Sequence, residues 1–512
     1  MQGHFGIRIV ALPTHGRTCV SHVVVIGGGN AALVAAIAAR ERGADVTVLE
    51  RAPYALRGGN SRFTAGAMRT VYGGVDDLRR LMPELTEAEV RRADFGAYPR
   101  ERFYDDLGRV TDYRADPELA ERLIDSSLEV LCWMREKGVR FLPLYGRQSF
   151  EVDGKVRFWG GVTVEAWGGG AGLIDSLTDI ARKSGVEIRY GAHARGLERT
   201  PDGFEVCLGS APEAHRLAAD AVVLACGGFE SNPAWRARYL GPGWDLAKVR
   251  GTRFNTGDGI RMAVDVGAAT RGNFSGCHAV AWDMNAPEFG ELDVGDNFQK
   301  HSYPFGIVVN REGRRFVDEG ADFRNFTYAR YGREILNQPG QCAWQLFDAK
   351  VAHLLRDEYR IAKVTKATAD SIQALAERIA SAETMNAAAL VAEVARFNAA
   401  VDTATPFDPT VKDGRGTVGL AVPKSNWANR LDTPPFEAYG VTCGITFTFG
   451  GLAVDAEARV LSEDGSPIPC LFAAGELVGG LYYFNYPGGT GLTAGAVFGR
   501  TAGRNASVVG TL

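Results

Sequence analysis

The stretch from Val23 to Arg40 constrains the fold more than any other part of this 512-residue chain. Its sequence, VVVIGGGNAALVAAIAAR, begins with a β-branched run, which is typical of a parallel strand that is buried on both faces. Three glycines follow, and then an alanine-rich segment that ends at Arg42 and Gly43. The order of strand, glycine turn and helix predicts the first unit of a nucleotide-binding α/β fold.

The glycine turn fits the pattern G-x-G-x-x-A with Gly27, Gly29 and Ala32. The first glycine permits a tight turn, the second lets the backbone approach a pyrophosphate, and the small third residue lets helix and strand pack closely. The helix then begins at Asn30 and Ala31, where free N–H groups face the phosphates. These residues predict a dinucleotide site.

The second predicted strand, DVTVLE, runs from Asp45 to Glu50 and ends 23 residues after Gly27. We expect the Glu50 carboxylate to accept hydrogen bonds from ribose hydroxyls, with Arg51 at the same site. FAD and NAD fit these segments equally well.

Three later segments favour FAD, whose flavin ring lies far from the adenine and needs its own anchors. They are the glycine-rich loop RAPYALRGGNSRFTAGAMR, the strand AVVLACGG, and the C-terminal CLFAAGELVGGLYYFNYPGGTGLTAGAVFGR, which returns to the nucleotide fold after more than 200 residues. The predicted FAD contacts in these later parts of the chain are Gly58, Gly59, Asn60, Ser61, Thr64, Gly66, Ala67, Ala194, Ala225, Cys226, Gly227, Gly475, Glu476, Gly489, Thr490, Gly491 and Leu492.

The motifs GGGNAA, RGGNSRFTAGAM, ACGGF, FTFGG, AAGE and NYPGGTGLTAGAVFGR together resemble the fumarate reductase/succinate dehydrogenase flavoprotein family. The resemblance extends from about residue 21 to 508. It implies a Rossmann-like FAD-binding domain of the three-layer ββα/βα type with an inserted α+β capping domain. Covalent members attach the flavin through a histidine in the loop after the second strand. Residues 58–68 contain none, so we expect noncovalent FAD.

Composition and the resemblance divide the chain into four parts. We expect an N-terminal extension at 1–20, the first part of the FAD-binding domain at 21–273, the capping domain at 274–446, and the second part of the FAD-binding domain at 447–512.

The segment FVDEGADFRNFTYARYG, residues 316–332, carries the predicted catalytic residue. By resemblance, Arg324 matches the family's arginine that donates or accepts the proton. The alternative is an ion pair at the surface or between domains. The family's relay of a glutamate and a second arginine is replaced by Gln299 and Ser302, so the relay is absent or rebuilt. The possible replacements are Asp318, Glu319, Asp322 and Tyr328.

Two histidines are candidates for holding a substrate carboxylate. His278, in GNFSGCHAV, matches a substrate-binding histidine of the family, and His301 is a further candidate. Fumarate reductases place a histidine and an arginine where this chain has Phe447 and Tyr486, so a plain C4-dicarboxylate is not expected. Arg62, Arg69 and Lys300 are the candidates to replace the lost charge. The candidates for an aromatic wall are Trp282, Tyr482, Tyr483, Phe484 and Tyr486.

Within the family, the segments RFVDEGADFRNFTYARYG and GNFSGCHAV are most similar to the tricarballylate dehydrogenases. This implies oxidation of tricarballylate to cis-aconitate by hydride transfer to flavin N5, with electrons passed to a separate iron–sulfur protein at the membrane. The alternatives are a fumarate-reductase-like alkene reductase, a flavoprotein resembling precorrin-3B synthase, and a noncatalytic assembly protein stabilised by FAD.

Charge and cysteine spacing exclude several other classes of protein. The net charge of −4 gives no indication of nucleic-acid binding. The eight cysteines include no C-x-x-C pair, so no metal site is expected. Scattered thiols favour a cytoplasmic protein. We expect any membrane association to be through the iron–sulfur partner. Apolar runs are too short to cross a bilayer, and the first 20 residues lack the apolar core of a signal peptide.

Overall fold

A six-stranded sheet carries the predicted nucleotide turn. The computed structural model describes residues 21–209, 215–382 and 385–508, so the predicted extension at 1–20 lies outside the described residues. The strand order is β20 (Arg459–Leu461), β21 (Pro467–Ala473), β13 (Ala221–Leu224), β1 (His22–Ile26), β2 (Asp45–Glu50) and β9 (Glu187–Tyr190). All neighbours are parallel except β20 and β21. The residues of β1 from Val23 onward are buried, as its β-branched sequence predicts.

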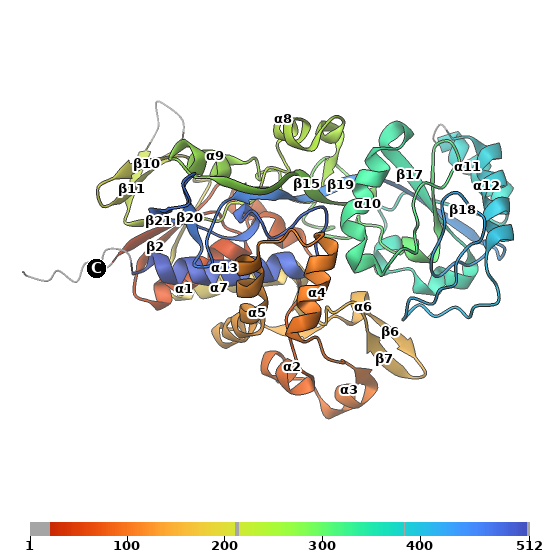
Figure 1. The fold of residues 1–512 in the computed structure, drawn as a ribbon, viewed down its shortest axis with the longest axis horizontal. Coiled ribbons are helices and arrows are strands. Elements are labelled where there is room, and N and C mark those ends of the chain that lie inside the picture. Colours follow the sequence, from red (N-terminus) through yellow and green to blue (C-terminus); the bar gives the residue numbers. More distant parts are fainter. Residues whose placement is uncertain (1–20, 210–214, 383–384, 509–512) are drawn as a thin grey trace, which may run out of the picture.

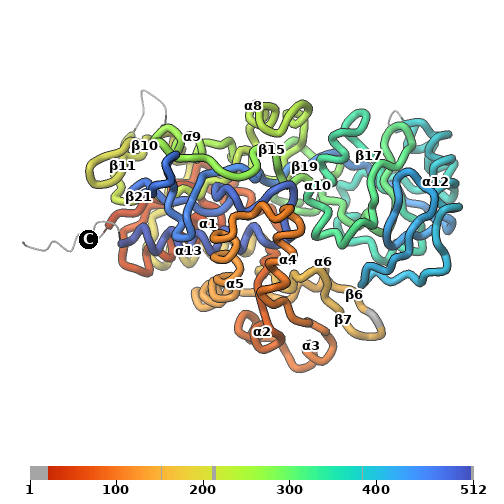
Figure 2. The backbone as a smooth tube through the Cα atoms, in the orientation of Figure 1, coloured from red at the N-terminus to blue at the C-terminus, as the bar shows by residue number. Residues whose placement is uncertain are grey.

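Helices cover one face of this sheet and a small sheet covers the other, which gives three layers. On the helical face, α1 (Asn30–Glu41) packs against α7 (Gly169–Lys183) and along α13 (Thr490–Ala506). Figures 1 and 2 show α1 and α13 side by side, although one lies near each end of the chain. The other face meets the antiparallel meander of β10 (Ala194–Thr200), β11 (Gly203–Leu208) and β12 (His215–Ala219).

The contact between α1 and α13 depends on glycine. A Cβ added at Gly503 would collide with the carbonyl oxygen of Ala35, and one at Gly499 would lie 2.6 Å from the carbonyl oxygen of Ala31. The two backbones therefore approach one another closely, and the C-terminal helix completes the core that the N-terminal strand begins.

A mainly helical segment, orange in Figure 1, lies beside this body. Its elements are α2 (Val75–Leu81), α3 (Glu87–Arg92), β4 (Ala93–Asp94), α4 (Arg100–Val110), α5 (Pro117–Lys137), β5 (Phe141–Pro143), α6 (Tyr145–Gln148), β6 (Ser149–Val152), β7 (Lys155–Phe158) and β8 (Val164–Ala166). The short β3 (Ala67–Met68) pairs with β8 and ties the glycine-rich loop to this segment.

The predicted cap contains a second sheet and its own apolar cluster. The sheet is formed by β14 (Lys248–Val249), β15 (Thr270–Asp283), β16 (Ile307–Asn310), β17 (Cys342–Phe347), β18 (Lys366–Ala369) and β19 (Phe436–Leu452). The helices of the cap are α10 (Tyr328–Leu336), α11 (Ile372–Ala382) and α12 (Ala387–Ala400), whereas α8 (Pro233–Trp235), β14 and α9 (Asp258–Asp265) precede residue 274. The apolar faces of α11 and α12 close over this sheet in a cluster that includes Trp344, Leu375 and Phe397.

Two long strands join the cap to the FAD-binding body. β15 and β19 pair antiparallel from Thr270 opposite Leu452 to Asp283 opposite Val441, and both predicted domain boundaries fall inside them. The division at 273/274 and 446/447 stays a prediction. The fold class is confirmed: a Rossmann-like α/β body carries an inserted cap.

Candidate functional site

One large cavity extends from the glycine turn to the cap. Its volume is about 1910 Å³, including solvent at its mouth, and its wall reaches from Gly27 at the end of β1 to Arg324. Most of the predicted FAD contacts line it, namely Gly27, Gly29, Asn30, Ala31, Glu50, Arg51, Gly59, Asn60, Ser61, Thr64, Ala67, Ala194, Ala225, Cys226, Gly227, Gly475, Glu476, Gly489, Gly491 and Leu492. The predicted catalytic and substrate-binding residues line the same cavity, namely His278, His301, Arg324 and Tyr328.

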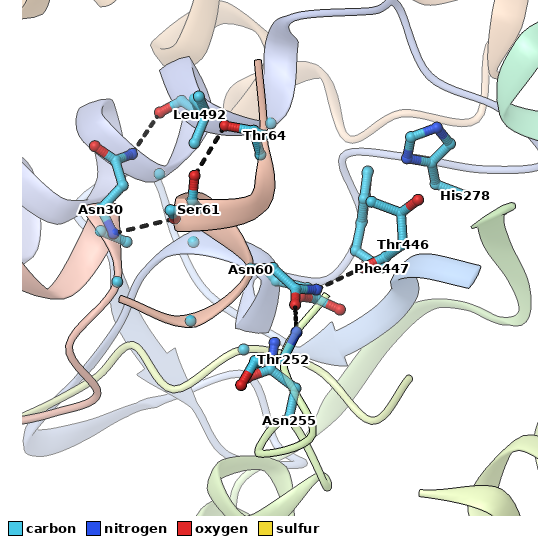
Figure 3. A pocket seen from close by; sticks show the side chains of 18 of the residues that line it. Asn30, Asn60, Ser61, Thr64, Thr252, Asn255, His278, Thr446, Phe447 and Leu492 are labelled. Atoms are coloured by element: carbon cyan, nitrogen blue, oxygen red, sulfur yellow. Dashed lines mark hydrogen bonds between the residues drawn. The ribbon is translucent and has the colours of Figure 1, made fainter. Parts of the chain in front are cut away.

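Two helix N-termini meet at the end of the cavity near the glycine turn, where α1 begins at Asn30 and α13 begins at Thr490. The Asn30 amide donates to the carbonyl of Leu492 at 2.8 Å, and its backbone N–H donates to Ser61 at 3.2 Å (Figure 3). A Cβ at Gly29 would approach no atom closer than 3.5 Å, so this glycine leaves open space beside the helix N-terminus. This is the geometry that an anionic diphosphate requires.

Glu50 lies at the end of β2 and is almost fully buried. Its Oε1 accepts a hydrogen bond from the backbone N–H of Ala52 at 2.7 Å. Burial raises the pKa of this carboxyl to about 6, against the opposing effect of its backbone hydrogen bonds. Its neighbour Arg51 forms an ion pair with Asp258 at 2.8 Å and so holds the adjacent wall in place.

A polar network lies midway along the cavity. The side chain of Asn60 donates to the carbonyl of Thr446 at 2.6 Å and accepts from the backbone N–H of Thr252 at 2.9 Å (Figure 3). It also donates to Glu230 at 2.6 Å. The Glu230 carboxyl is fully buried beside Glu476, and burial together with this neighbour raises the pKa of Glu230 well above its usual range. The network fixes the loop at Gly59–Phe63 against β19.

These features fit FAD. Asn30 Oδ1, in the cavity wall, is buried without a hydrogen-bond partner, so the site has a polar group for a ligand to satisfy. The glycine turn and the two helix N-termini suit a pyrophosphate, and the cavity continues far enough to hold a second ring system.

The structure places three of the predicted FAD contacts outside the cavity wall. A Cβ at Gly58 would lie 2.8 Å from Ile174, and one at Gly66 would lie 2.7 Å from the backbone of Gly169. Thr490 is fully buried and donates its hydroxyl to the carbonyl of Pro487 at 2.5 Å. Loop packing leaves room only for glycine at positions 58 and 66, and it holds the Thr490 hydroxyl against its own loop. These three residues therefore act on the site indirectly, by shaping the loops around it.

His278, on β15, lies at the cap end of the cavity within a group of aromatic rings. Its ring centroid is 4.9 Å from that of Tyr328, 5.2 Å from Phe447 and 4.8 Å from Tyr486. Neither ring nitrogen has a partner, and burial holds the pKa of His278 well below its ordinary value, so this imidazole is neutral. The hydroxyls of Tyr328 and Tyr486 contact each other at 2.5 Å.

Arg324 is only 8% exposed and is connected to this aromatic group through His301, whose ring centroid lies 4.8 Å from that of Tyr328. Its Nη2 donates to the carbonyl of Arg147 at 2.8 Å, and its Nη1 lies 3.3 Å from His301 Nδ1. Burial lowers the pKa of Arg324, and the positive charge of Arg147 lowers it further. Glu358 opposes this shift, and no ion pair of Arg324 is found among the described residues, so the alternative of a surface or interdomain ion pair has no support.

Sequence reasoning missed the charged residues that share this end of the cavity. The Asp296 carboxylate accepts from Arg250 Nε, Arg147 Nη1 and Gln299 Nε2, each at 2.7 Å. These residues come from loops and a four-residue helix, so no local pattern could have grouped them.

The expected replacement charges lie elsewhere, which corrects the sequence prediction. Arg69 is fully buried and donates to the carbonyls of Gly488 and Gly160, so it links two backbone segments behind the site. Arg62 pairs with Asp175. Lys300 donates to backbone carbonyls, the closest of them that of Phe298 at 3.1 Å.

The proposed relay carboxylates are also engaged outside the cavity, and of the four candidates only Tyr328 lines it. Glu319 forms a buried pair with Arg315, Asp322 pairs with Arg109, and Asp318 accepts from the backbone N–H of Ser425.

The aromatic wall is smaller than the sequence suggested. Tyr482 and Tyr486 line the cavity, whereas Trp282 packs in the core against Phe298 and Phe484 is 45% exposed. Tyr483 does not line the cavity either.

Two further searches concern the described ranges 21–209, 215–382 and 385–508. In them no three His, Cys, Asp or Glu side chains are grouped as metal ligands. None of their helices combines the length and the apolar character that a bilayer crossing needs.

Comparison with known proteins identifies the cofactor. The family model described as "FAD binding domain" matches residues 22–492. The probable fumarate reductase Ifc3 of Shewanella frigidimarina is 28% identical over 96% of this chain and 76% of its own length. The 4-oxocyclohexanecarboxylate 2-dehydrogenase of Sinomonas cyclohexanicum is 30% identical over 94% of this chain and 92% of its own.

Solved structures show the same fold. The open conformation of a flavocytochrome c3 fumarate reductase gives a TM-score of 0.69 at 26% identity, covering 96% of this chain and 79% of that one. A 3-ketosteroid delta1-dehydrogenase from Sterolibacterium denitrificans gives a TM-score of 0.70 at 20% identity, covering 95% and 99%. With its cofactor identified as FAD, this chain belongs to the FAD-dependent oxidoreductase family that includes the fumarate reductases.

Proposed function

We propose that this protein exchanges hydride between FAD and a carbon–carbon bond beside the carboxylate of a small molecule whose body is flat and largely apolar. One observation carries the proposal: at the catalytic end of the cavity the Arg324 guanidinium adjoins the aromatic group around His278, because His301 contacts both Arg324 and Tyr328. A planar apolar body suits aromatic rings, and a carboxylate suits a guanidinium.

The balance of charge supports a single anchored carboxylate. Arg147 and Arg250 are already paired with Asp296, which leaves Arg324 as the unpaired guanidinium in this cavity. His278 adds no charge because its pKa is depressed. The name 4-oxocyclohexanecarboxylate 2-dehydrogenase, carried by a relative that is 30% identical, describes a ring with one carboxylate.

Tricarballylate, which the family resemblance favours, is the second candidate substrate. Its three carboxylates need three cationic or donor-rich subsites. The aromatic group of the cavity offers the uncharged hydroxyls of Tyr328, Tyr482 and Tyr486 and the neutral His278. A substrate with one carboxylate therefore fits the described residues better.

In this proposal FAD, held by the glycine turn, Asn30, Glu50 and the residues around Asn60, supplies the hydride acceptor or donor. Arg324 exchanges the proton of the neighbouring carbon, which its buried position and lowered pKa favour. His301 faces Arg324 through Nδ1, so it carries its own proton on Nε2 and holds the guanidinium in position. Reduction of an alkene uses the same residues in reverse.

The electron partner in this proposal is a separate iron–sulfur protein at the membrane, and the protein itself is cytoplasmic, as the family resemblance implies. Substrate-reduced protein mixed anaerobically with membrane fractions should be reoxidised. Reoxidation by the soluble fraction alone would place the partner elsewhere.

Anaerobic mixing with matched compounds tests the function. We expect ring-bearing monocarboxylates with a saturated carbon–carbon bond beside the carboxylate, such as cyclohexanecarboxylate and 3-phenylpropionate, to bleach the flavin absorbance, while their amides, which lack the charge, do not. Bleaching by tricarballylate alone would select the second candidate. No bleaching by any carboxylate, with FAD bound, would contradict the proposal.

A further inference from the structure

A second cavity lies against the far side of the Arg324–His301 pair. Its volume is about 300 Å³ with the solvent at its mouth, and Arg324, His301 and Arg356 line it together with Trp159. The other lining side chains are apolar: Phe150, Pro304, Phe305, Phe323, Pro409 and Trp427. Arg324 and His301 therefore form the wall between the two cavities.

The polar groups of this cavity lack partners. Trp159 Nε1, Arg324 Nε, Arg356 Nη1 and His301 Nε2 are all buried without a hydrogen bond. His301 is 1% exposed, and Trp159 and Arg324 are each 8% exposed. Three of these atoms are obligate donors, and the fourth is a donor in the tautomer that faces Arg324, so the missing partner is an acceptor.

The charges around this wall do not balance. The guanidiniums of Arg147, Arg250, Arg324 and Arg356 are accompanied by three carboxyl groups, Asp296, Glu358 and Glu165, and burial raises the pKa of Glu165 to about 7.

Arg324 and Arg356 both donate to the backbone carbonyl of Arg147, so the two guanidinium groups lie close together. The carboxyl groups are fewer than the guanidiniums, and unpaired positive charge in a buried region is costly.

The enclosed part of the cavity admits only a small occupant, because the centre of a water-sized occupant has about 20 Å³ available, and the lining rings pack directly on one another. The ring centroids of Trp159 and Phe323 are 5.4 Å apart, and those of Phe323 and Trp427 are 5.5 Å apart. The guanidiniums of Arg324 and Arg356 lie 5.5 and 5.8 Å from the Trp159 ring. We propose that the second cavity binds a small monovalent anion of halide size, held by Arg324 and Arg356 and distinct from the substrate carboxylate.

Chloride titration of the FAD-loaded protein without substrate tests this site in solution. Chloride should raise the melting temperature saturably relative to gluconate at equal ionic strength, because gluconate is too large to enter. Arg356→Gln should weaken the apparent chloride affinity at least tenfold. Its matched control, Arg360→Gln, alters an exposed arginine of the same loop that pairs with Glu437, and should keep the chloride response.

Equal curves for chloride and gluconate, or a chloride response that is unchanged in Arg356→Gln, would overturn the proposal. If Arg356→Gln does not fold, crystals of the unmodified protein soaked in bromide decide the question. An anomalous peak between Arg324 and Arg356 is expected, and a map with no peak there would reject the site. Loss of the peak on addition of substrate would show that the substrate carboxylate occupies this place, which also rejects a separate site.

Discussion

A buried guanidinium beside a neutral imidazole is the central feature of the catalytic end. Arg324 was predicted because it lies in a recognisable segment, and its neighbours Arg147, Arg250 and Asp296 were not. A motif records residues whose roles depend on local chain geometry. An ion-pair network drawn from separate loops leaves no periodicity or spacing, so only the folded chain reveals it.

Replacement of Arg324 by lysine tests the proton-transfer role. We expect kcat to fall by about 10²–10⁴-fold, the usual contribution of a positioned acid or base, while FAD absorbance stays unchanged. Lysine loses the planar fork that reaches both the Arg147 carbonyl and His301. Arg330→Lys, at an exposed position on α10, is the control and should keep full activity. An active Arg324→Lys protein would remove this residue from the mechanism.

The raised pKa of Glu50 predicts how FAD affinity depends on pH. The apoprotein keeps this carboxyl protonated up to a pH of about 6, and ribose hydroxyls bind best to the ionised form. The affinity should therefore be constant above that pH and fall below it, by up to about tenfold per pH unit. Fluorescence titration of apoprotein with FAD between pH 5 and 8 measures this. Glu50→Gln should bind more weakly at pH 8 and show a flat profile, and a sloping profile in that variant would assign the effect to another group.

The elements around the cofactor were predicted closely because each has a strong local pattern. Strand β1, the glycine turn, α1 and β2 appear where the sequence indicated them, and α13 begins in the predicted loop at Thr490. The strands β15 and β19 were not predicted at their full lengths of 14 and 17 residues. Their sequences contain glycines, and the register of their pairing shifts along the strands. The pairing joins residues far apart in the chain, so the sequence carries no local signal of it.

The close packing of α1 on α13 can be tested with a pair of alanine substitutions in the same helix. Gly503→Ala would force a methyl group against the Ala35 carbonyl, so we expect the free energy of unfolding to fall by about 1–3 kcal/mol. A Cβ at Gly491 meets no atom within 4 Å, so Gly491→Ala should leave the stability of the apoprotein nearly unchanged. Denaturant unfolding of the two apoproteins provides the comparison. Equal loss of stability in both variants would show that helix spacing does not limit this site.

The whole chain is organised so that both of its ends build the same sheet and helical layer. β21 lies beside β13, and α13 covers α1, so the FAD-binding body is incomplete until the last segment has folded. The sequence predicted this return because the C-terminal glycine motif repeats the strand–turn–helix logic of the first turn. It did not predict that the cap would share continuous strands with the body, and its boundaries at 273/274 and 446/447 fall within them.

Truncation tests this dependence on the C-terminal segment. A chain that ends at Gly488 lacks α13, exposes the buried face of α1, and should be colourless and aggregate on expression. A chain that ends at Val508 keeps the helix and should bind FAD normally. The flavin absorbance of the purified proteins decides between these outcomes, and a yellow, monomeric Gly488 truncation would contradict the expected dependence.

The 17 residues of β19 have a mechanical consequence. The strand pairs with β17 in the cap through Glu437 to Thr442, and its segment Thr446–Phe449 lines the FAD cavity. Because the same strand belongs to the cap sheet and to the cavity wall, we expect a displacement of the cap to alter the surroundings of the cofactor. The visible absorbance spectrum of the bound flavin should therefore report the position of the cap. Even an unreactive ligand that moves the cap should shift this spectrum.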